Sequence, residues 1–172
     1  MKETGVVRRL DELGRVVIPK EIRKRLKIKN GDMVDIFTKD EFIILQKYHP
    51  LKQDILPIKS ILEAVSKQMN VGLLIFDDSS VIYSTVKGIK TGEMISADFI
   101  KRLPSFLEKE LSSRLDLEVI PGHKFEKDLY IERILVNYET YGYILVVDDM
   151  ITKKHKESIE LVNEYMKHFL QN

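Results

Sequence analysis

The sequence predicts an α+β protein whose chain forms two domains. A chain of 172 residues is long enough for one domain or for two small ones. The distribution of charge favours two, because residues 1–52 contain 13 basic and 8 acidic side chains, whereas residues 53–172 contain 15 basic and 19 acidic ones. Both parts mix short β-branched runs with amphipathic helical segments. We therefore expect domains at residues 1–50 and 55–172, joined by a linker at residues 51–54.

The composition excludes several classes of function. The chain has no cysteine, which rules out a disulfide framework, a thiolate zinc site and a thiol nucleophile. The four histidines lack metal-ligand spacing, and no Gly-x-Ser-x-Gly elbow or catalytic triad order is present. We expect a protein that is not an enzyme and that has no cofactor and no metal. The first residues lack the apolar core of a signal peptide and no apolar run reaches about 20 residues, so we expect a cytoplasmic location without membrane contact.

In the first domain, turn signals separate four short strands and one helix. We expect strands at residues 5–10, 15–18, 33–38 and 42–48. Pro19 suits the first position of a short helix over residues 19–26, because that position needs no amide hydrogen. A segment of this size buries too little surface to be stable alone. We therefore expect a homodimer, in which exchange of strands between protomers supplies the missing core.

Basic side chains gather on one face of the predicted helix. Lys20, Arg23, Lys24 and Lys27 follow the i, i+3, i+4, i+7 spacing. A solvated face explains such a stripe by itself. However, Arg8 and Arg9 end the first predicted strand, Arg15 opens the second, and a two-fold dimer presents every one of these groups twice. Arginine binds a phosphate or a guanine edge with two parallel hydrogen bonds, so this set of residues favours double-stranded DNA as the partner.

Residues 4–24 also resemble a known family. The run TGVVRRLDELGRVVIPKEIRK, and within it the block DELGRVVIP, is similar to the amino-terminal DNA-binding domain of the AbrB transition-state regulators. The similarity continues through Gly31-Asp32 and residues 43–48. The length and layout of the whole chain resemble those members of the family that have a second domain of the GAF type.

The resemblance implies a swapped-hairpin β-barrel of two interleaved chains and a transcriptional regulator of sporulation genes, an activator or a repressor, associated with the nucleoid. It places DNA contacts at Arg8, Arg15, Arg23 and Lys24. The family commonly has a second arginine where this chain has Lys24, which keeps the charge but loses the two-donor fork. Swapped-hairpin folds also occur in antitoxins, which is the alternative function. An antitoxin would cover its toxin with a disordered acidic tail, whereas the rest of this chain is patterned as an ordered domain.

The second domain is predicted to surround an antiparallel sheet with helices. A helical seam covers residues 51–69, and further helices are expected at residues 97–113 and 152–170. The expected strands are residues 71–77, 81–86, 117–120, 129–137 and 141–148. This order of elements resembles GAF or PAS sensor domains.

Two functions remain open for this second domain. The layout and a loop with two glycines suggest a small-molecule effector pocket near Gly88, Gly92 and Phe99. The other hypothesis is an oligomerisation module without a ligand, because the first and last helices have heptad-like spacing that suits either packing on their own sheet or a bundle between subunits. If both domains associate with different partners, a homotetramer with two DNA-binding heads follows, and linking the heads raises the apparent affinity for DNA.

Overall fold

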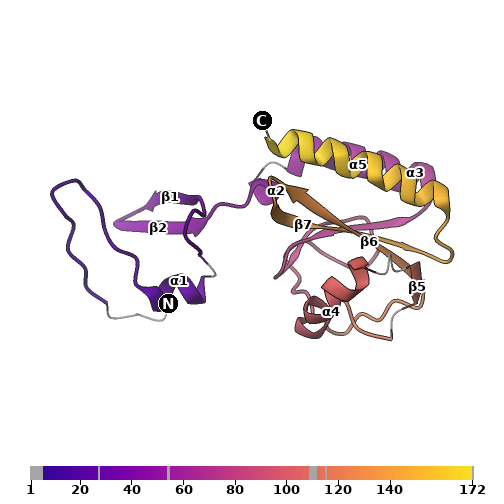
Figure 1. The fold of residues 1–172 in the computed structure, drawn as a ribbon, viewed down its shortest axis with the longest axis horizontal. Helices are drawn as coiled ribbons and strands as arrows, with labels where there is room; N and C mark the ends of the chain where they lie inside the picture. The colour runs from indigo at the N-terminus through magenta and orange to yellow at the C-terminus, as the bar shows by residue number, and fades with distance from the viewer. Residues whose placement is uncertain (1–5, 27, 54, 109–111, 115, 172) are drawn as a thin grey trace. The chain divides into compact units, whose positions relative to one another are not determined.

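The computed structural model describes residues 6–26, 28–53, 55–108, 112–114 and 116–171. The chain divides into two compact units, Met1–Tyr48 and His49–Asn172 (Figure 1). Each unit is an assembly of helices and strands, so the predicted α+β class is confirmed. None of the helices in the described part of the chain combines the length and the apolar character that a membrane span requires.

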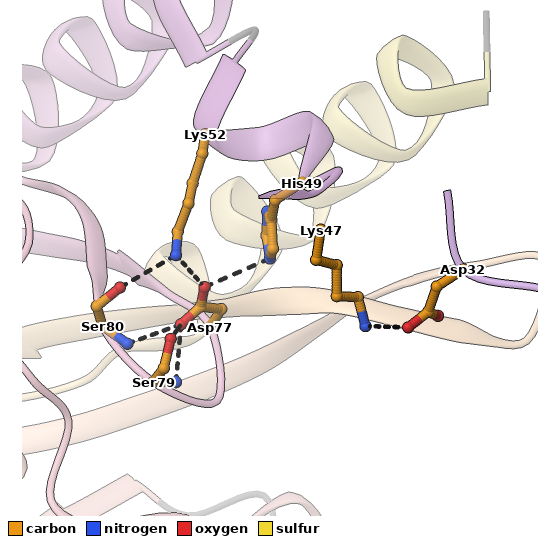
Figure 2. A network of polar contacts seen from close by, with 7 residues as sticks. All are labelled: Asp32, Lys47, His49, Lys52, Asp77, Ser79 and Ser80. Carbon is orange, nitrogen blue, oxygen red and sulfur yellow. Dashed lines mark hydrogen bonds and ion pairs between the residues drawn. The ribbon is translucent and has the colours of Figure 1, made fainter. Parts of the chain in front are cut away.

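The first unit contains one short helix and one β-hairpin. Helix α1 is Lys20–Arg25, and strands β1 (Val34–Lys39) and β2 (Phe42–Lys47) pair antiparallel, with Val34 opposite Lys47. These elements confirm the predicted helix and the third and fourth predicted strands to within two residues. The Asp32 carboxylate joins the turn before β1 to the end of β2, because it accepts a hydrogen bond from the Lys29 amide at 2.8 Å. Its second contact is with the Lys47 ammonium, also at 2.8 Å (Figure 2).

The two strands predicted at residues 5–10 and 15–18 are not formed in the described residues. Residues 6–10 and 15–19 have no regular structure, and in the described residues the backbone hydrogen bond between the two arms runs from the Asp11 amide to the Arg15 carbonyl, at 3.0 Å. A strand needs a neighbour that satisfies its amides and carbonyls. The single chain offers these segments one such rung, which explains the difference from the prediction.

The first unit has almost no core of its own. Ile28, at 9% exposure, is the one buried side chain among the described residues of this unit. Both faces of the β1–β2 hairpin are apolar, with Ile36 and Ile43 on one face and Phe37 and Ile44 on the other, and all four side chains are exposed. The other exposed large hydrophobic side chains of the unit are Val6, Val7, Leu10, Leu13, Val16, Val17, Leu26, Met33 and Phe42.

The second unit is a five-stranded antiparallel sheet with helices on both faces. The strands are β3 (Gly72–Phe76), β4 (Val81–Ser84), β5 (Ser112–Arg114), β6 (Asp128–Val136) and β7 (Glu139–Asp148), in the order β4-β3-β7-β6-β5. Helices α3 (Ile55–Met69) and α5 (Lys153–Gln171) lie side by side on one face, and α4 (Ala97–Glu108) covers the other (Figure 1). Alternate residues of the central strands therefore belong to two separate hydrophobic cores, one on each face of the sheet.

Two predicted elements of this unit differ from the structure, one in its end and one in its type. The helix expected over residues 97–113 ends at Glu108, and Ser112–Arg114 forms the edge strand β5 instead; residues 109–111 lie outside the described residues. The strand expected at residues 117–120 is irregular, with one isolated bridge between Ile120 and His123. Val119 and Ile120 are almost fully buried, so burial in the core, and not strand pairing, accounts for that apolar run.

The segment expected as a linker is part of the second unit. Residues Pro50–Gln53 form the short helix α2, whose Leu51 side chain is fully buried; residue 54 lies outside the described residues. Leu51 packs over Gly142 of β7, where an added Cβ would lie 3.1 Å from Leu51 Cδ1 and 2.8 Å from the Phe76 carbonyl oxygen. A glycine at this position therefore lets both the helix and the neighbouring strand approach closely.

Asp77 holds α2 by a second set of contacts. Its carboxylate accepts hydrogen bonds from the Ser79 and Ser80 amides, both at 2.7 Å, and Lys52 Nζ lies 2.6 Å from the other oxygen (Figure 2). His49 Nε2 lies 3.5 Å from the same oxygen as Lys52. Burial alone would raise the pKa of Asp77, but the hydrogen bonds from Lys52 and Ser79 outweigh it and lower the pKa to about 2. The carboxylate is therefore charged at neutral pH and fixes the first turn of the second unit to its sheet.

Replacing Asp77 with asparagine should destabilise the second unit. The variant Asp77→Asn removes the charge that Lys52 pairs with, and the lowered pKa corresponds to a loss of about 2 kcal/mol in the free energy of unfolding at pH 7. Because the pKa of Asp77 is lowered from 3.8 to about 2, this stabilisation is present above about pH 4 and disappears as the pH falls towards 2. Urea unfolding of both proteins at several pH values measures the difference.

The matched control is Glu160→Gln, which removes a carboxylate from an exposed position of the same unit. A surface change of this kind should alter the free energy of unfolding by less than about 0.5 kcal/mol. A loss of equal size in the two variants, or a loss in Asp77→Asn that does not shrink in acid, would contradict this role of Asp77.

Candidate nucleic-acid interface

Three of the arginines predicted to contact DNA lie around one tight turn of the first unit. Arg8 and Arg9 precede the turn, Arg15 follows it, and all three are exposed. The turn is closed by the hydrogen bond from the Asp11 amide to the Arg15 carbonyl and by one from the Gly14 amide to the Asp11 carbonyl, both at 3.0 Å. The turn therefore places arginines on both of its arms.

Gly14 gives this turn its conformation. Its φ of +74° lies in the left-handed region, which side chains with a Cβ adopt at a cost. No other atom lies within 4 Å of the position that a Cβ would take, so the requirement comes from the backbone and not from crowding.

The Arg15 side chain is held by the turn itself. Asp11 Oδ2 accepts a hydrogen bond from Arg15 Nε at 2.7 Å, and Asp11 Oδ1 accepts one from the Arg15 amide at 2.7 Å. The Arg15 side chain is nevertheless 72% exposed. Its guanidinium is thus fixed at one nitrogen while its outer end faces solvent.

The remaining basic residues lie on or beside α1. Lys20 and Lys24 are exposed, whereas Arg23 is partly buried and donates from Nη1 to Asn30 Oδ1 at 3.0 Å. Spacings of three and four residues place all three on one helical face, as predicted. Lys27, the last member of the predicted stripe, lies outside the described residues. No described residue of α1 is buried, so the apolar side of this helix is also uncovered in the single chain.

The arginines around the turn and the basic residues of α1 are close in the chain, because residues 16–19 alone separate Arg15 from the start of α1. The two residues that orient the arginines, Asp11 and Asn30, are not among the predicted site residues, because the sequence pattern indicates only turns at their positions. An acid four residues before an arginine, across a tight turn, is nevertheless a signal for such a pair.

The residues predicted to line an effector pocket lie in and beside one core of the second unit. Phe99 on α4 is fully buried, with its ring centroid 5.8 Å from those of Phe76 and Phe106. Gly88 and Gly92 are exposed, and both have a φ of +89° in the loop that follows β4. Phe99 thus serves the core of the α4 face, and a pocket at these three residues stays a prediction.

The first unit is similar to a known protein family and to a known regulatory protein. A family model described as antidote-toxin recognition MazE, bacterial antitoxin, matches residues 7–53. The transition state regulatory protein AbrB of Bacillus subtilis is 58% identical over 50 residues, which are 29% of this chain and 52% of that protein. The resemblance predicted from the sequence is confirmed by this match.

A longer match involves both units. Stage V sporulation protein T of Bacillus subtilis is 37% identical over 115 residues, which are 66% of this chain and 61% of that protein. A stretch of this length exceeds the first unit, so the similarity extends into the second. The chain thus matches between about half and three fifths of the length of these two relatives.

Solved structures match the same amino-terminal segment. The solution structure of the N-domain of the transcription factor abrB is 58% identical, covers 29% of this chain and 96% of that one, and superposes with a TM-score of 0.28. A structure described as the amino-terminal DNA recognition domain of Bacillus subtilis AbrB has the same identity and a TM-score of 0.26. The similarity rests on the sequence identity and not on these superpositions.

The turn that presents the arginines should depend on Gly14. Replacing Gly14 with alanine should lower the stability of the first unit by about 1 kcal/mol, because alanine resists a positive φ. Replacing it with asparagine should cost less, since asparagine tolerates this conformation better. Denaturant unfolding followed by far-ultraviolet circular dichroism measures both. Equal stability of the alanine variant and the wild type would show that the turn does not need the left-handed conformation.

Proposed function

We propose that this chain, whose resemblance to the AbrB-family transition-state regulators is confirmed over a stretch of 50 residues, is a DNA-binding transcription regulator. The proposal rests most on the 58% identity to AbrB, because the matching segment of that protein is described as a DNA recognition domain. The exposed arginines of the first unit support it independently. Regulation of sporulation genes is the finer proposal, supported by the match to stage V sporulation protein T.

The DNA-binding form is a homodimer in which two first units complete one core. A two-stranded hairpin is only marginally stable by itself, and here its two faces are both apolar and exposed. A second copy supplies a cover for these faces and partner strands for residues 6–10 and 15–18. These observations support the swapped-hairpin barrel that the family resemblance implies.

DNA is held by Arg8, Arg9, Arg15, Lys20, Arg23 and Lys24 from both protomers. Arginine and lysine side chains attract the phosphates, and release of counterions makes the binding depend steeply on salt. The outer end of Arg15 is exposed and suits paired hydrogen bonds to a guanine or to a phosphate. Lys24 contributes charge without such a fork.

The second unit acts as a GAF-like module for oligomerisation and for sensing a small molecule. Its antiparallel sheet with helices on both faces supports the GAF-like assignment. Two first units joined in a dimer, and two dimers joined through second units, give a homotetramer with two DNA-binding heads. Linked heads bind a DNA with two correctly spaced sites more tightly than either head alone.

A toxin-binding function is the second candidate. It is favoured by the match of residues 7–53 to the MazE antitoxin family. Against it, residues 49–172 fold into a unit with two hydrophobic cores, whereas an antitoxin tail of the kind expected from the sequence would be disordered until it meets its toxin. The regulator is therefore the function that the structure supports better.

Removing two arginines should abolish most of the DNA binding. The double variant Arg15→Ala/Arg23→Ala should bind promoter fragments more weakly than the wild type across a salt series. The slope of log affinity against log salt concentration should fall by about 0.9 for each phosphate that the variant no longer neutralises. Fluorescence anisotropy with labelled duplexes measures affinity and slope together, and circular dichroism verifies that the variant is folded.

The matched control is Lys153→Ala/Lys154→Ala, which removes the same charge from exposed positions of the second unit. This control should keep nearly the wild-type affinity and slope. If the wild type does not bind duplex DNA at low salt, or if the two double variants lose affinity equally, the proposed interface is wrong.

A charge on the apolar hairpin should break the dimer. Replacing Ile43, which is 74% exposed in the single chain, with aspartate would bury an unpaired carboxylate in the proposed dimer core. The mass measured by analytical ultracentrifugation should then fall by half at a concentration where the wild type is fully assembled. The variant Lys39→Glu changes an exposed charge in the same hairpin and should leave the mass unchanged. An unchanged mass for Ile43→Asp would contradict the shared core.

A further inference from the structure

We propose that Asp11 is a positioning residue that holds Arg15 ready for DNA and so determines sequence selectivity. The inference rests on the proposed function, because it assigns a role within the proposed DNA interface. It concerns a residue whose own charge repels DNA. Its presence among exposed arginines therefore needs a reason other than attraction to phosphate.

The geometry shows a carboxylate with both oxygens engaged by the turn. Asp11 Oδ1 accepts hydrogen bonds from the Leu13 amide at 3.0 Å and from the Arg15 amide at 2.7 Å. Asp11 Oδ2 accepts the Arg15 Nε hydrogen at 2.7 Å. The backbone bonds fix the carboxylate, and the fixed carboxylate in turn fixes the guanidinium.

The contact uses the one guanidinium nitrogen that DNA recognition does not need. A guanidinium has five N–H donors, one on Nε and four on the two terminal nitrogens. A guanine edge or a phosphate is bound by two parallel hydrogen bonds, for which the terminal nitrogens suffice. Within the described residues, Arg15 makes no other side-chain hydrogen bond, and its side chain is 72% exposed. The N–H donors of the two terminal nitrogens, which recognition needs, are thus left without a partner in the described residues.

Fixing Arg15 before DNA arrives favours selectivity over affinity. A long side chain that is already ordered loses less conformational freedom when it binds. It also keeps the direction of its N–H donors, so the acceptors of a wrong base do not align with them. The cost is electrostatic, because the Asp11 carboxylate weakens attraction to every phosphate nearby. The hydrogen bonds from the Arg15 backbone and side chain lower the pKa of Asp11, so the carboxylate stays charged at neutral pH.

Arg23 is oriented in a different way. Asn30 Oδ1 accepts from a terminal nitrogen of Arg23, at 3.0 Å, and Asn30 has no charge. The Arg23 fork is therefore partly occupied, whereas the Arg15 fork is not. This contrast points to Arg15 as the arginine that distinguishes bases and to Asp11 as the residue that enables it.

The test compares Asp11→Asn with Glu12→Gln in the full-length protein. Both variants remove one negative charge at adjacent exposed positions, so simple electrostatics predicts the same result for both. Asparagine can still accept the two amide hydrogens of the turn through its Oδ1, but its NH2 group cannot accept from Arg15 Nε. The turn is therefore kept, while Arg15 Nε has no acceptor on residue 11.

Selectivity is measured as a ratio of affinities. The probes are a duplex that the wild-type protein enriches from a random library and a scrambled duplex of the same composition. Both variants should bind the scrambled duplex slightly more tightly than the wild type. The ratio of affinities for the enriched and scrambled duplexes should fall on the order of tenfold in Asp11→Asn and stay unchanged in Glu12→Gln.

A double-mutant cycle identifies Arg15 as the residue through which Asp11 acts. In an Arg15→Lys background, which lacks Nε, Asp11→Asn should change the ratio no further. Nuclear magnetic resonance gives an independent measurement without DNA, in which the Arg15 Nε–H signal should be protected from solvent exchange in the wild type and in Glu12→Gln but not in Asp11→Asn.

Each failure has a separate meaning. Wild-type binding with an unchanged ratio in Asp11→Asn, an equal fall in Glu12→Gln, or an Arg15 Nε–H that exchanges equally fast in all three proteins would overturn the positioning role and leave the proposed function intact. Enrichment of no sequence by a wild type that binds DNA would also overturn the positioning role alone. Absence of any DNA binding by the wild type would overturn both.

Discussion

The described residues of the first unit leave nearly all of their apolar side chains unburied, and most features of the unit follow from this constraint. With Ile28 as the one buried side chain among its described residues, the unit exposes apolar groups on both faces of its hairpin and beside α1. A chain segment with this pattern must find its cover elsewhere, because exposed apolar area of this extent favours association. In the proposed dimer, a second copy also doubles the arginines around the Asp11–Arg15 turn. The proposed dimerisation and the proposed DNA binding therefore depend on the same segment of the chain.

The second unit, in contrast, buries its apolar side chains within one chain. Its central strands bury both of their faces, one under α3 and α5 and the other under α4. Helix α2 belongs to this unit because Leu51 packs over Gly142 and Lys52 pairs with the buried Asp77. The segment that follows the first unit is therefore anchored to the second unit's sheet by an apolar contact and an ionic one, and residues 51–53 of the expected linker belong to α2.

Local patterns predicted the elements whose partners lie nearby in the chain. Helices α1, α3 and α5 and strands β1, β2, β3, β6 and β7 lie close to where periodicity and turn signals placed them. The strands expected at residues 5–10 and 15–18 are not formed in the described residues, because the single chain offers them one backbone rung. The strand expected at residues 117–120 is absent because burial makes a core-filling loop as apolar as a strand. The helix expected through residue 113 has its described end at Glu108, and Ser112–Arg114 pairs with β6 instead. The basic residues of the candidate site can be identified in the sequence, whereas the contacts of Asp11 and Asn30 depend on the geometry of the turns that hold them.

In the proposed assembly, two copies of this chain form one symmetric surface for DNA. Hydroxyl-radical footprinting of the intact protein, on a duplex selected by the wild type from a random library, tests this symmetry directly. We expect a protected pattern with two-fold symmetry, because each protomer contributes the same turn and the same helix face. A single asymmetric protected region, or no protection at concentrations where the protein is fully assembled, would contradict it.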